Sequence, residues 1–448
     1  MSTSSNAEPP YPRPAYAWYV VAVLMVAYTF SFIDRQILSL LSTEVIRDLQ
    51  LTDSEFGLLA GFAFALFYTV LGIPIGIAAD RYSRRGIIAT GIAVWSLMTA
   101  ACGFTRSFLE LFLARMGVGV GEAALSPPAY SMITDYFPPK TLGVALGTYG
   151  MGIYIGSGLA FIVGGAVVGA VSGQMVPMPL VGDMKGWQAT FVIVGLPGLL
   201  VALMMLTVRE PYRRGVQRSG PNGAVVSVPF SEVLAFVRKR WRTYGAHFLG
   251  FAPLSLIGYG SSVWTPAFFY RTYGEAPADV GLIFGLAVLI MGPLGIVAGG
   301  ALADRWRRNG MSDSYLRAGA LAALILIPVN VATPLMPSPE YAYLLLFPGA
   351  FLGAMPFGVA PAAIQAITPN QMRAQVSAIY LFTVNMIGLG LGPWLIGWMT
   401  DNVFGDPQDL RYSLAIAGLV TGLWAVLVLR SGFGPFRRCA KEAEAWAS

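Results

Sequence analysis

Long apolar runs, separated by short clusters of charged and turn-forming residues, follow one another along the whole chain. Most runs reach about 20 residues, the length of helix that crosses the roughly 30 Å hydrocarbon core of a bilayer. The pattern predicts transmembrane helices and no β-sheet core. The twelve expected spans are about 17–41, 55–79, 87–105, 108–135, 142–171, 187–208, 243–270, 280–303, 318–335, 341–367, 374–400 and 412–429.

The longest polar interruption divides these spans into two groups of six. We therefore expect an all-α membrane protein of two six-helix bundles. Residues 1–16 contain several prolines and lack the basic start and short apolar core of a cleaved signal peptide. The expected parts are a disordered N-terminal tail 1–16, an N-terminal bundle 17–208, a cytoplasmic linker 209–242 with a surface helix at 231–241, a C-terminal bundle 243–429 and a C-terminal tail 430–448.

Composition excludes an ordinary soluble protein. The chain is 56% hydrophobic and only 12% charged, whereas soluble domains average about 25% charged. The net charge of +6 would suggest nucleic acid as a partner of a soluble protein, but here the basic residues occupy loops beside lipid headgroups. We expect membrane lipids as partners and no nucleic acid. With one histidine and two cysteines, neither a metal site, a cofactor nor a disulfide framework is expected.

The distribution of basic residues predicts the orientation. Most of the 29 Lys and Arg residues fall in loops on the same side as the N-terminus. The loops on the other side hold only Arg47, Arg106, Lys185, Arg271 and Arg411. Because basic loops stay in the cytoplasm, both termini are expected there. The absence of any Asn-x-Ser/Thr acceptor sequence favours a bacterial inner membrane.

One loop motif occurs twice, after the second helix of each half. The sequence Gly-Ile-Ala-Ala-Asp-Arg-Tyr-Ser-Arg-Arg at 76–85 recurs as Gly-Ala-Leu-Ala-Asp-Arg-Trp-Arg-Arg at 300–308. The residues of interest are Gly76, Asp80, Arg81, Arg84 and Arg85 in the first loop and Gly300, Asp304, Arg305 and Arg308 in the second. An internal repeat of this kind is typical of transporters built from parallel halves.

The two loops look like motif A of the major facilitator superfamily, and the resemblance covers essentially the whole chain. Three further segments resemble the Spinster branch: Phe-Ile-Asp-Arg at 32–35, Arg-Met-Gly-Val-Gly-Val-Gly-Glu at 115–122, and Asp-Tyr-Phe at 135–137. The resemblance implies the major facilitator fold and a carrier of lysophospholipids or sphingosine phosphate.

Four charged residues lie well inside predicted spans, namely Asp34, Arg35, Arg115 and Glu122. Such residues are costly in hydrocarbon, so they usually serve transport. The resemblance places helices one and four at a central cavity, which makes these residues candidates for proton coupling and substrate binding. Which acid pairs with which arginine stays open. A static ion-pair network that fixes helix packing is the alternative.

For the repeated loops we expect a gating role. The resemblance puts Asp80 against the start of helix eleven near 373–377, where the helix dipole favours a carboxylate. Asp304 is expected to act in the same way near the start of helix five. The alternative is that the basic loops only set the topology.

The C-terminal half has no charge deep in a span but many aromatic side chains. The candidates for cavity lining are Tyr259, Trp264, Phe268, Phe351 and Gln365. Packing in the core or against lipid is their alternative role. Opposite a charged face, such residues would form an amphipathic cavity suited to a charged head and an apolar tail.

The sequence thus predicts a monomeric secondary active transporter that works by alternating access. It is expected to be proton-coupled and to move a small amphiphilic, lysolipid-like or sphingolipid-like molecule. A drug or organic-anion transporter and a facilitative uniporter are the alternatives. A membrane enzyme is disfavoured because no nucleophile, base or other catalytic cluster is found. A channel would usually have a filter segment and a pore shared among subunits, and it is disfavoured because the two repeated loops favour alternating access.

Overall fold

The computed structural model describes residues 9–179, 182–213 and 228–444, and these residues are mostly helical. The helices of the first half are α1 (Pro14–Leu40), α2 (Ser42–Leu49), α3 (Asp53–Gly57), η1 (Leu58–Phe62), α4 (Ala63–Arg81), α5 (Arg84–Cys102), α6 (Phe108–Glu122), α7 (Ser126–Tyr136), α8 (Pro139–Val171), α9 (Gly186–Gly195) and α10 (Gly198–Met205). Those of the second half are α11 (Phe230–Lys239), α12 (Trp241–Tyr273), α13 (Pro277–Arg308), α14 (Ser314–Leu335), α15 (Pro339–Ile367), α16 (Asn370–Val384), η2 (Asn385–Gly390), α17 (Gly392–Met399), η3 (Thr400–Phe404), η4 (Pro407–Asp409) and α18 (Leu410–Glu444). An antiparallel hairpin joins β1 (Met175–Met178) to β2 (Gly182–Lys185).

The predicted membrane-spanning helices are present. Within the described residues, ten helical segments are long and apolar enough to cross a membrane. The other two spans are α12, which contains Pro253 and Pro266, and the interrupted pair α6 and α7. Together they account for twelve spans, and the prediction of an all-α membrane protein is confirmed.

Two expected spans are interrupted, and one helix continues well beyond its expected end. The fourth span is broken between α6 and α7, because Pro127 and Pro128 lack the N–H groups that would continue the helix. The sixth span is broken at Pro197, between α9 and α10. The segment from 430, expected as a tail, continues α18 to Glu444. Apolar residues of this extension, such as Phe436, are buried against the second half.

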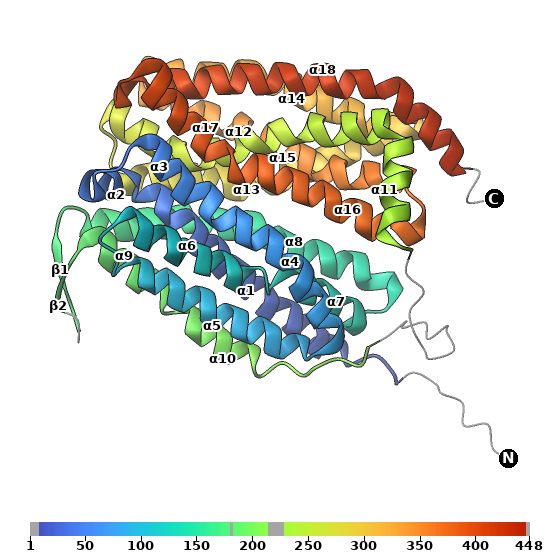
Figure 1. The fold of residues 1–448 in the computed structure, drawn as a ribbon, viewed down its shortest axis with the longest axis horizontal. Helices are drawn as coiled ribbons and strands as arrows, with labels where there is room; N and C mark the ends of the chain where they lie inside the picture. The colour runs from blue at the N-terminus through green and yellow to red at the C-terminus, as the bar shows by residue number, and fades with distance from the viewer. Residues whose placement is uncertain (1–8, 180–181, 214–227, 445–448) are drawn as a thin grey trace.

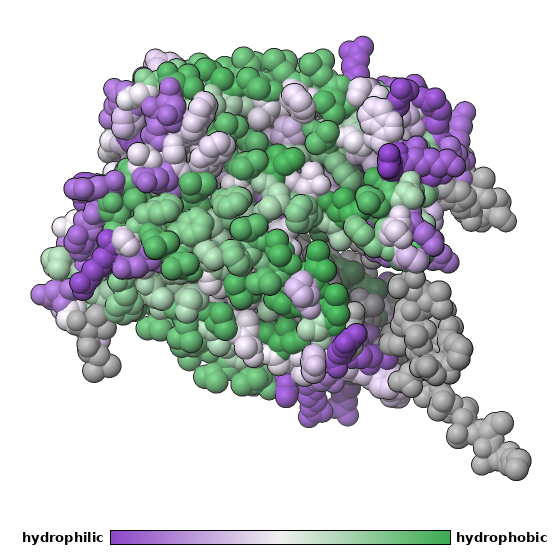
Figure 2. Space-filling view, viewed as in Figure 1, coloured by the Kyte–Doolittle hydropathy of each residue, from purple (hydrophilic) through white to green (hydrophobic). Residues whose placement is uncertain are grey.

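The two halves form two bundles that lie one above the other in Figure 1. The helix α1 begins and α18 ends at the same end of the molecule, which we call the termini end. The β1–β2 hairpin lies at the opposite end, which we call the hairpin end. Figure 2 shows a band of hydrophobic residues over both bundles, with hydrophilic residues gathered at the two ends. This is the surface expected of a protein that spans a bilayer.

Among the described residues, the contact between α8 and α13 shows the bundles touching closely away from the termini end. A Cβ atom added at Gly285 would lie 2.6 Å from the Gly158 carbonyl oxygen, and one added at Gly165 would lie 2.9 Å from the Gly281 Cα. Small residues thus let the two backbones meet. Nearer the start of α8, a Cβ at Gly143, Gly147 or Gly150 would meet nothing within 4 Å. The bundles diverge there, and Figure 2 shows a recess between them at the termini end.

Candidate functional site

Arg35 of α1 and Glu122 of α6 form a buried ion pair inside the first bundle. The Arg35 Nη2 atom lies 2.5 Å from Glu122 Oε2, and their side chains are 8% and 1% exposed. Ser31, one helical turn before Arg35, donates a hydrogen bond of 2.6 Å to the same oxygen. Glu122 is the last residue of α6, directly before the break that precedes α7. A discontinuous helix therefore presents this carboxylate.

Aromatic rings surround the Arg35 guanidinium. Its Cζ atom lies 4.3 Å from the centroid of the Phe64 ring, 4.8 Å from that of Phe32 and 5.3 Å from that of Tyr68. Tyr259 of α12, in the other bundle, is close enough to Arg35 for electrostatic interaction. Cation–π contacts stabilise a charge that has lost most of its water. The Arg35–Glu122 pair therefore lies near the boundary between the two bundles.

The other two intramembrane charges, Asp34 of α1 and Arg115 of α6, meet on a different side of α1 from the Arg35–Glu122 pair. Arg115 donates from Nη1 to the backbone carbonyl of Asp34 at 3.2 Å, and both side chains are fully buried. Within the described residues, neither oxygen of the Asp34 carboxylate has a hydrogen-bond partner. Trp95 and Thr99 of α5 lie within interacting range of this carboxylate. Because consecutive helical residues point about 100° apart, Asp34 faces the interior of the first bundle while Arg35 reaches Glu122.

The five candidate cavity residues fall into different environments. Tyr259 is partly buried and Gln365 is exposed. Trp264 and Phe268 are fully buried in the apolar core near the hairpin end. Phe351 packs inside the second bundle, against the cluster around Leu326. Tyr259 therefore lies near the Arg35–Glu122 pair, whereas Trp264, Phe268 and Phe351 serve packing in this conformation.

An interaction network joins the two bundles at the hairpin end, and sequence reasoning did not identify it. Arg271, in the last turn of α12, binds both carboxylate oxygens of Asp53 at 2.6 and 2.7 Å. Asp401 of η3 accepts hydrogen bonds from the backbone N–H of Asp53 at 3.2 Å and of Ser54 at 2.6 Å. We call Asp53, Ser54, Arg271 and Asp401 the hairpin-end seal. In the sequence these residues look like ordinary loop charges, so only the folded chain reveals the pairing.

An aromatic contact lies beneath the hairpin-end seal. The Trp264 indole donates a hydrogen bond to the Pro393 carbonyl at 2.7 Å. The Trp264 ring packs edge-on against Phe56 of the first bundle, with 5.5 Å between the ring centroids. The Arg271 guanidinium lies 5.5 Å from the Trp264 ring centroid. The bundles are therefore closed to each other at the hairpin end by charge pairs and by packing.

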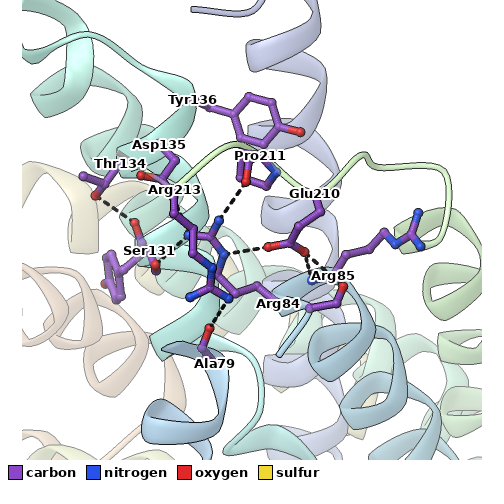
Figure 3. Close-up of polar contacts among 12 residues, drawn as sticks. Ala79, Arg84, Arg85, Ser131, Thr134, Asp135, Tyr136, Glu210, Pro211 and Arg213 are labelled. Atoms are coloured by element: carbon purple, nitrogen blue, oxygen red, sulfur yellow. Dashed lines mark hydrogen bonds and ion pairs between the residues drawn. The ribbon is translucent and has the colours of Figure 1, made fainter. Parts of the chain in front are cut away.

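A second network, within the first bundle, lies at the termini end around Arg84 (Figure 3). Arg84 is 1% exposed and binds Asp135 at 2.5 Å through Nη1 and Glu210 at 2.8 Å through Nε. It also donates to the Ser131 hydroxyl at 2.8 Å and to the Pro211 carbonyl at 3.1 Å. One guanidinium thus connects the repeated loop to α7 and to the segment after α10.

Glu210 is the acceptor on the loop side of this network. It receives hydrogen bonds of 3.0 Å from the Ser83 hydroxyl and from the Arg85 backbone N–H. Partial burial alone would raise the pKa of Glu210, but the hydrogen bonds from Arg85 and Arg84 lower it below the ordinary value of a glutamate. Glu210 is therefore the ionised partner of this loop at neutral pH. The sequence contained no motif that pointed to it.

Arg213 completes the network from the segment after α10. Its Nη2 atom donates to the carbonyl oxygen of Ala79 at 2.8 Å (Figure 3). The same atom donates to the carbonyl oxygen of Tyr82 at 2.7 Å. A cation at the last carbonyls of a helix is favoured by the helix dipole. The side chain of Asp80, which lies between these carbonyls in the sequence, is outside what the structure describes. We call Arg84, Arg85, Ser131, Asp135, Glu210 and Arg213 the termini-end cluster.

Among the described residues, the repeated loop of the second half has no comparable network, and Arg307 donates a single hydrogen bond, to the Tyr315 hydroxyl at 3.0 Å. Asp304, Arg305 and Arg308 are exposed, and none of them hydrogen-bonds or ion-pairs with a described residue. The contact expected between Asp304 and the start of α8 is therefore not seen among the described side chains. Arg81 is likewise exposed. The repeat is symmetric in sequence but not in the contacts of this conformation.

The chain matches known proteins over most of its length. The profile of the Major Facilitator Superfamily matches residues 24–386. An MFS-type efflux pump from Mycolicibacterium smegmatis is 29% identical over 414 residues, which cover 92% of this chain and 91% of the relative. Protein spinster homolog 1 from Rattus norvegicus is 28% identical over 429 residues, with coverage of 90% and 78%.

A solved structure agrees with these relatives. It is a bacterial homologue of the human lysosomal transporter Spinster, in an inward-facing and unoccupied conformation. Its TM-score is 0.77 at 29% sequence identity, and the match covers 96% of this chain and 99% of that one. The relatives are named as transporters and not as enzymes, in agreement with the expectation from the sequence. The chain therefore belongs to the major facilitator superfamily and is a Spinster-like transporter.

Proposed function

We propose that this transporter is proton-coupled and carries an amphiphilic, lysolipid-like or sphingolipid-like substrate by alternating access. The Arg35–Glu122 pair is the observation that supports this most strongly. It combines a buried cation, a carboxylate at a helix break and a ring of aromatic side chains near the boundary between the bundles. An anionic headgroup would bind Arg35, while an apolar tail would lie against the neighbouring rings.

Coupling would follow from competition for Arg35. When a substrate phosphate takes the guanidinium, Glu122 loses its cation in surroundings that exclude water. A carboxylate without a partner in an apolar place binds a proton more readily. Substrate binding and protonation of Glu122 would then occur together. Asp34, whose carboxylate has no hydrogen-bond partner among the described residues, is the second candidate for the proton.

Alternating access would come from movement of the bundles at 17–208 and 243–429 against each other. The hairpin-end seal closes one side, and the bundles diverge at the other. We propose that the termini end faces the cytoplasm of a bacterial cell, since the basic loops gather there. Asp80 and Asp304 of the repeated loops would form gate contacts when this side closes. The transporter is proposed to act as a monomer in the inner membrane.

A second candidate function is export or uptake of drugs or organic anions. The M. smegmatis relative is named an efflux pump, and a buried arginine also suits soluble anions. A facilitative uniporter would use the same site without a proton. These alternatives share the fold and differ in the ligand and in the dependence on pH.

A transport screen separates these functions. Purified protein in liposomes is supplied with lysophospholipids, sphingoid phosphates or short-chain organic anions at two pH values. We expect uptake of the lipids, stimulated by a pH gradient, and exchange of labelled for unlabelled lipid in counterflow. Uptake of short-chain anions alone would favour the second function, and lipid uptake that ignores the gradient would favour a uniporter.

Weakening the hairpin-end seal is expected to open that end. In Arg271→Gln, the closed state loses the two hydrogen bonds between this side chain and Asp53. The open state is little affected, because both side chains are hydrated when the bundles separate. We expect the fraction of molecules open at the hairpin end to rise about tenfold. The corresponding free-energy change lies within the range of about 1–3 kcal/mol that is typical of coupling between states. Spin labels at the exposed positions 47 and 406 would report the distance across the seal.

Arg411→Gln is the matched control for this prediction. Arg411 lies at the same end, but the carbonyl oxygens to which it donates in the described part of the chain belong to its own bundle, those of Pro334 at 3.1 Å and Met336 at 3.3 Å. Its loss should leave the label distances unchanged. Equal distance distributions in wild type and Arg271→Gln would show that the seal does not set the conformation.

A further inference from the structure

A groove on the outer face of the second bundle lies between α14 and α18. It has a volume of about 390 Å³ and is lined by Arg317, Ala320, Leu321, Leu324, Val426, Arg430 and Phe433. Figure 1 shows α18 along the upper edge of the bundle with α14 beside it. Leu324 is about half exposed, so the groove is open to the surface that carries the apolar band. It shares no residue with the Arg35–Glu122 site.

Positive charge is in excess at one end of the groove. Arg317 donates from Nε to Asp313 at 2.8 Å, and Arg437 lies 3.8 Å from the other oxygen of the same carboxylate. Arg430 is exposed and has no hydrogen-bond or ion-pair partner among the described residues. Two arginines therefore share one acidic group, and Arg430 is available for an external anion.

The Arg317 guanidinium is also oriented by packing. Its Cζ atom lies 4.8 Å from the centroid of the Phe433 ring, which belongs to α18. Asp313 is 1% exposed and contacts Arg317 from within the bundle. Hydrogen bonding and ring contact thus hold this guanidinium at the groove. A guanidinium fixed in this way favours the planar, two-point binding of a phosphate.

The depth of the lining residues matches the layers of a bilayer. The helix α14 begins at the termini end with Ser314, so Arg317 lies in its first turn. Leu324 is seven residues further along the helix, which places it about 10 Å deeper at 1.5 Å per residue. Val426 likewise precedes Arg430 by about one turn toward the membrane centre. With the apolar band in the bilayer, this order would place the arginines near the headgroups and the apolar floor beside the acyl chains.

We propose that this groove binds one anionic phospholipid from the leaflet at the termini end. The lipid phosphate would lie between Arg317 and Arg430, and an acyl chain would run over Leu321, Leu324 and Val426. The excess of arginine over acid selects an anionic headgroup over a zwitterionic one. The site would attach the second bundle to the leaflet, independently of the transported substrate.

Native mass spectrometry of the purified protein tests this site. The protein in detergent is titrated with phosphatidylglycerol or with phosphatidylcholine of the same acyl chains. We expect one high-affinity phosphatidylglycerol per protein that is weakened about fivefold in Arg430→Gln, the effect of one basic residue at a membrane surface. Arg242→Gln is the matched control, because Arg242 is an exposed arginine of the same bundle outside the groove.

Two further arms decide what the site recognises. Leu321→Trp fills the apolar floor without changing charge, and it should also weaken the bound phosphatidylglycerol. Inorganic phosphate in excess should not displace the lipid; displacement would mean a small-anion site and would overturn the lipid assignment. Equal phosphatidylglycerol affinity in wild type, Arg430→Gln and Leu321→Trp would overturn the proposal as a whole.

Discussion

Replacing Glu122 by glutamine is expected to abolish uptake driven by a pH gradient while leaving substrate counterflow measurable. Glutamine can still accept the hydrogen bond from Ser31, but it cannot exchange a proton or carry the charge that pairs with Arg35. One pH unit corresponds to about 1.36 kcal/mol per proton, so a one-unit gradient should drive about tenfold accumulation in the wild type. In Glu122→Gln we expect none. Uptake into liposomes with and without the gradient measures this difference.

The controls separate coupling from folding. Glu110→Gln changes an exposed glutamate of the same helix and should keep the gradient dependence. Thermal unfolding of Glu122→Gln in detergent, compared with the double variant Arg35→Gln with Glu122→Gln that leaves no buried unpaired arginine, tests whether the loss is due only to instability. If Glu122→Gln still accumulates substrate tenfold, Glu122 does not carry the proton.

Asp34→Asn then assigns the second acidic candidate. If Asp34→Asn keeps the gradient dependence and Glu122→Gln loses it, Glu122 alone carries the proton, and the Asp34–Arg115 contact serves packing. The reverse result would place the proton on Asp34.

The second large effect is expected at Arg84. In Arg84→Met, Asp135 loses its ion pair where its side chain is only 7% exposed, and Glu210 loses a partner at a more open position. Breaking a buried pair costs about 3–5 kcal/mol. We expect about 3 kcal/mol here, because water can reach Glu210. Thermal unfolding in detergent should show the loss, with the segment after α10 becoming more accessible to protease.

Two variants serve as comparisons for Arg84→Met. Arg81→Met changes an exposed arginine three positions away and should alter stability little. Arg84→Lys keeps a positive charge but lacks the five-donor fork that reaches Asp135, Glu210 and the Pro211 carbonyl at once, so its stability should be intermediate. Equal melting temperatures for Arg84→Met and Arg81→Met would contradict a structural role of the termini-end cluster.

The two networks give the molecule different kinds of contact at its two ends. The hairpin-end seal joins residues of opposite bundles, so it must break when that end opens. The termini-end cluster joins helices of one bundle through the repeated loop, so it can persist through such a movement. This difference explains why we expect Arg271→Gln to shift a conformational equilibrium and Arg84→Met to reduce stability.

The sequence by itself determined the fold class and the family. A helix that crosses hydrocarbon needs about 20 mostly apolar residues in a row and satisfies its own backbone hydrogen bonds. Each span can therefore be recognised from its own residues. The motifs at 76–85 and 300–308 likewise consist of adjacent residues. The cost of charge in a membrane marked Asp34, Arg35, Arg115 and Glu122 as unusual, without reference to their neighbours.

Only the tertiary structure decided the partners of these residues. Asp34 and Arg35 are adjacent in the chain, yet their different directions on α1 take Arg35 to Glu122 and leave the Asp34 carboxylate among α5 side chains. The pairing of Asp53 with Arg271 depends on the contact between two bundles far apart in the sequence. Ion pairs require atoms within about 4 Å, a distance set by helix packing and not by sequence spacing. The local cost of a charge can therefore be predicted from the sequence, but its partner cannot.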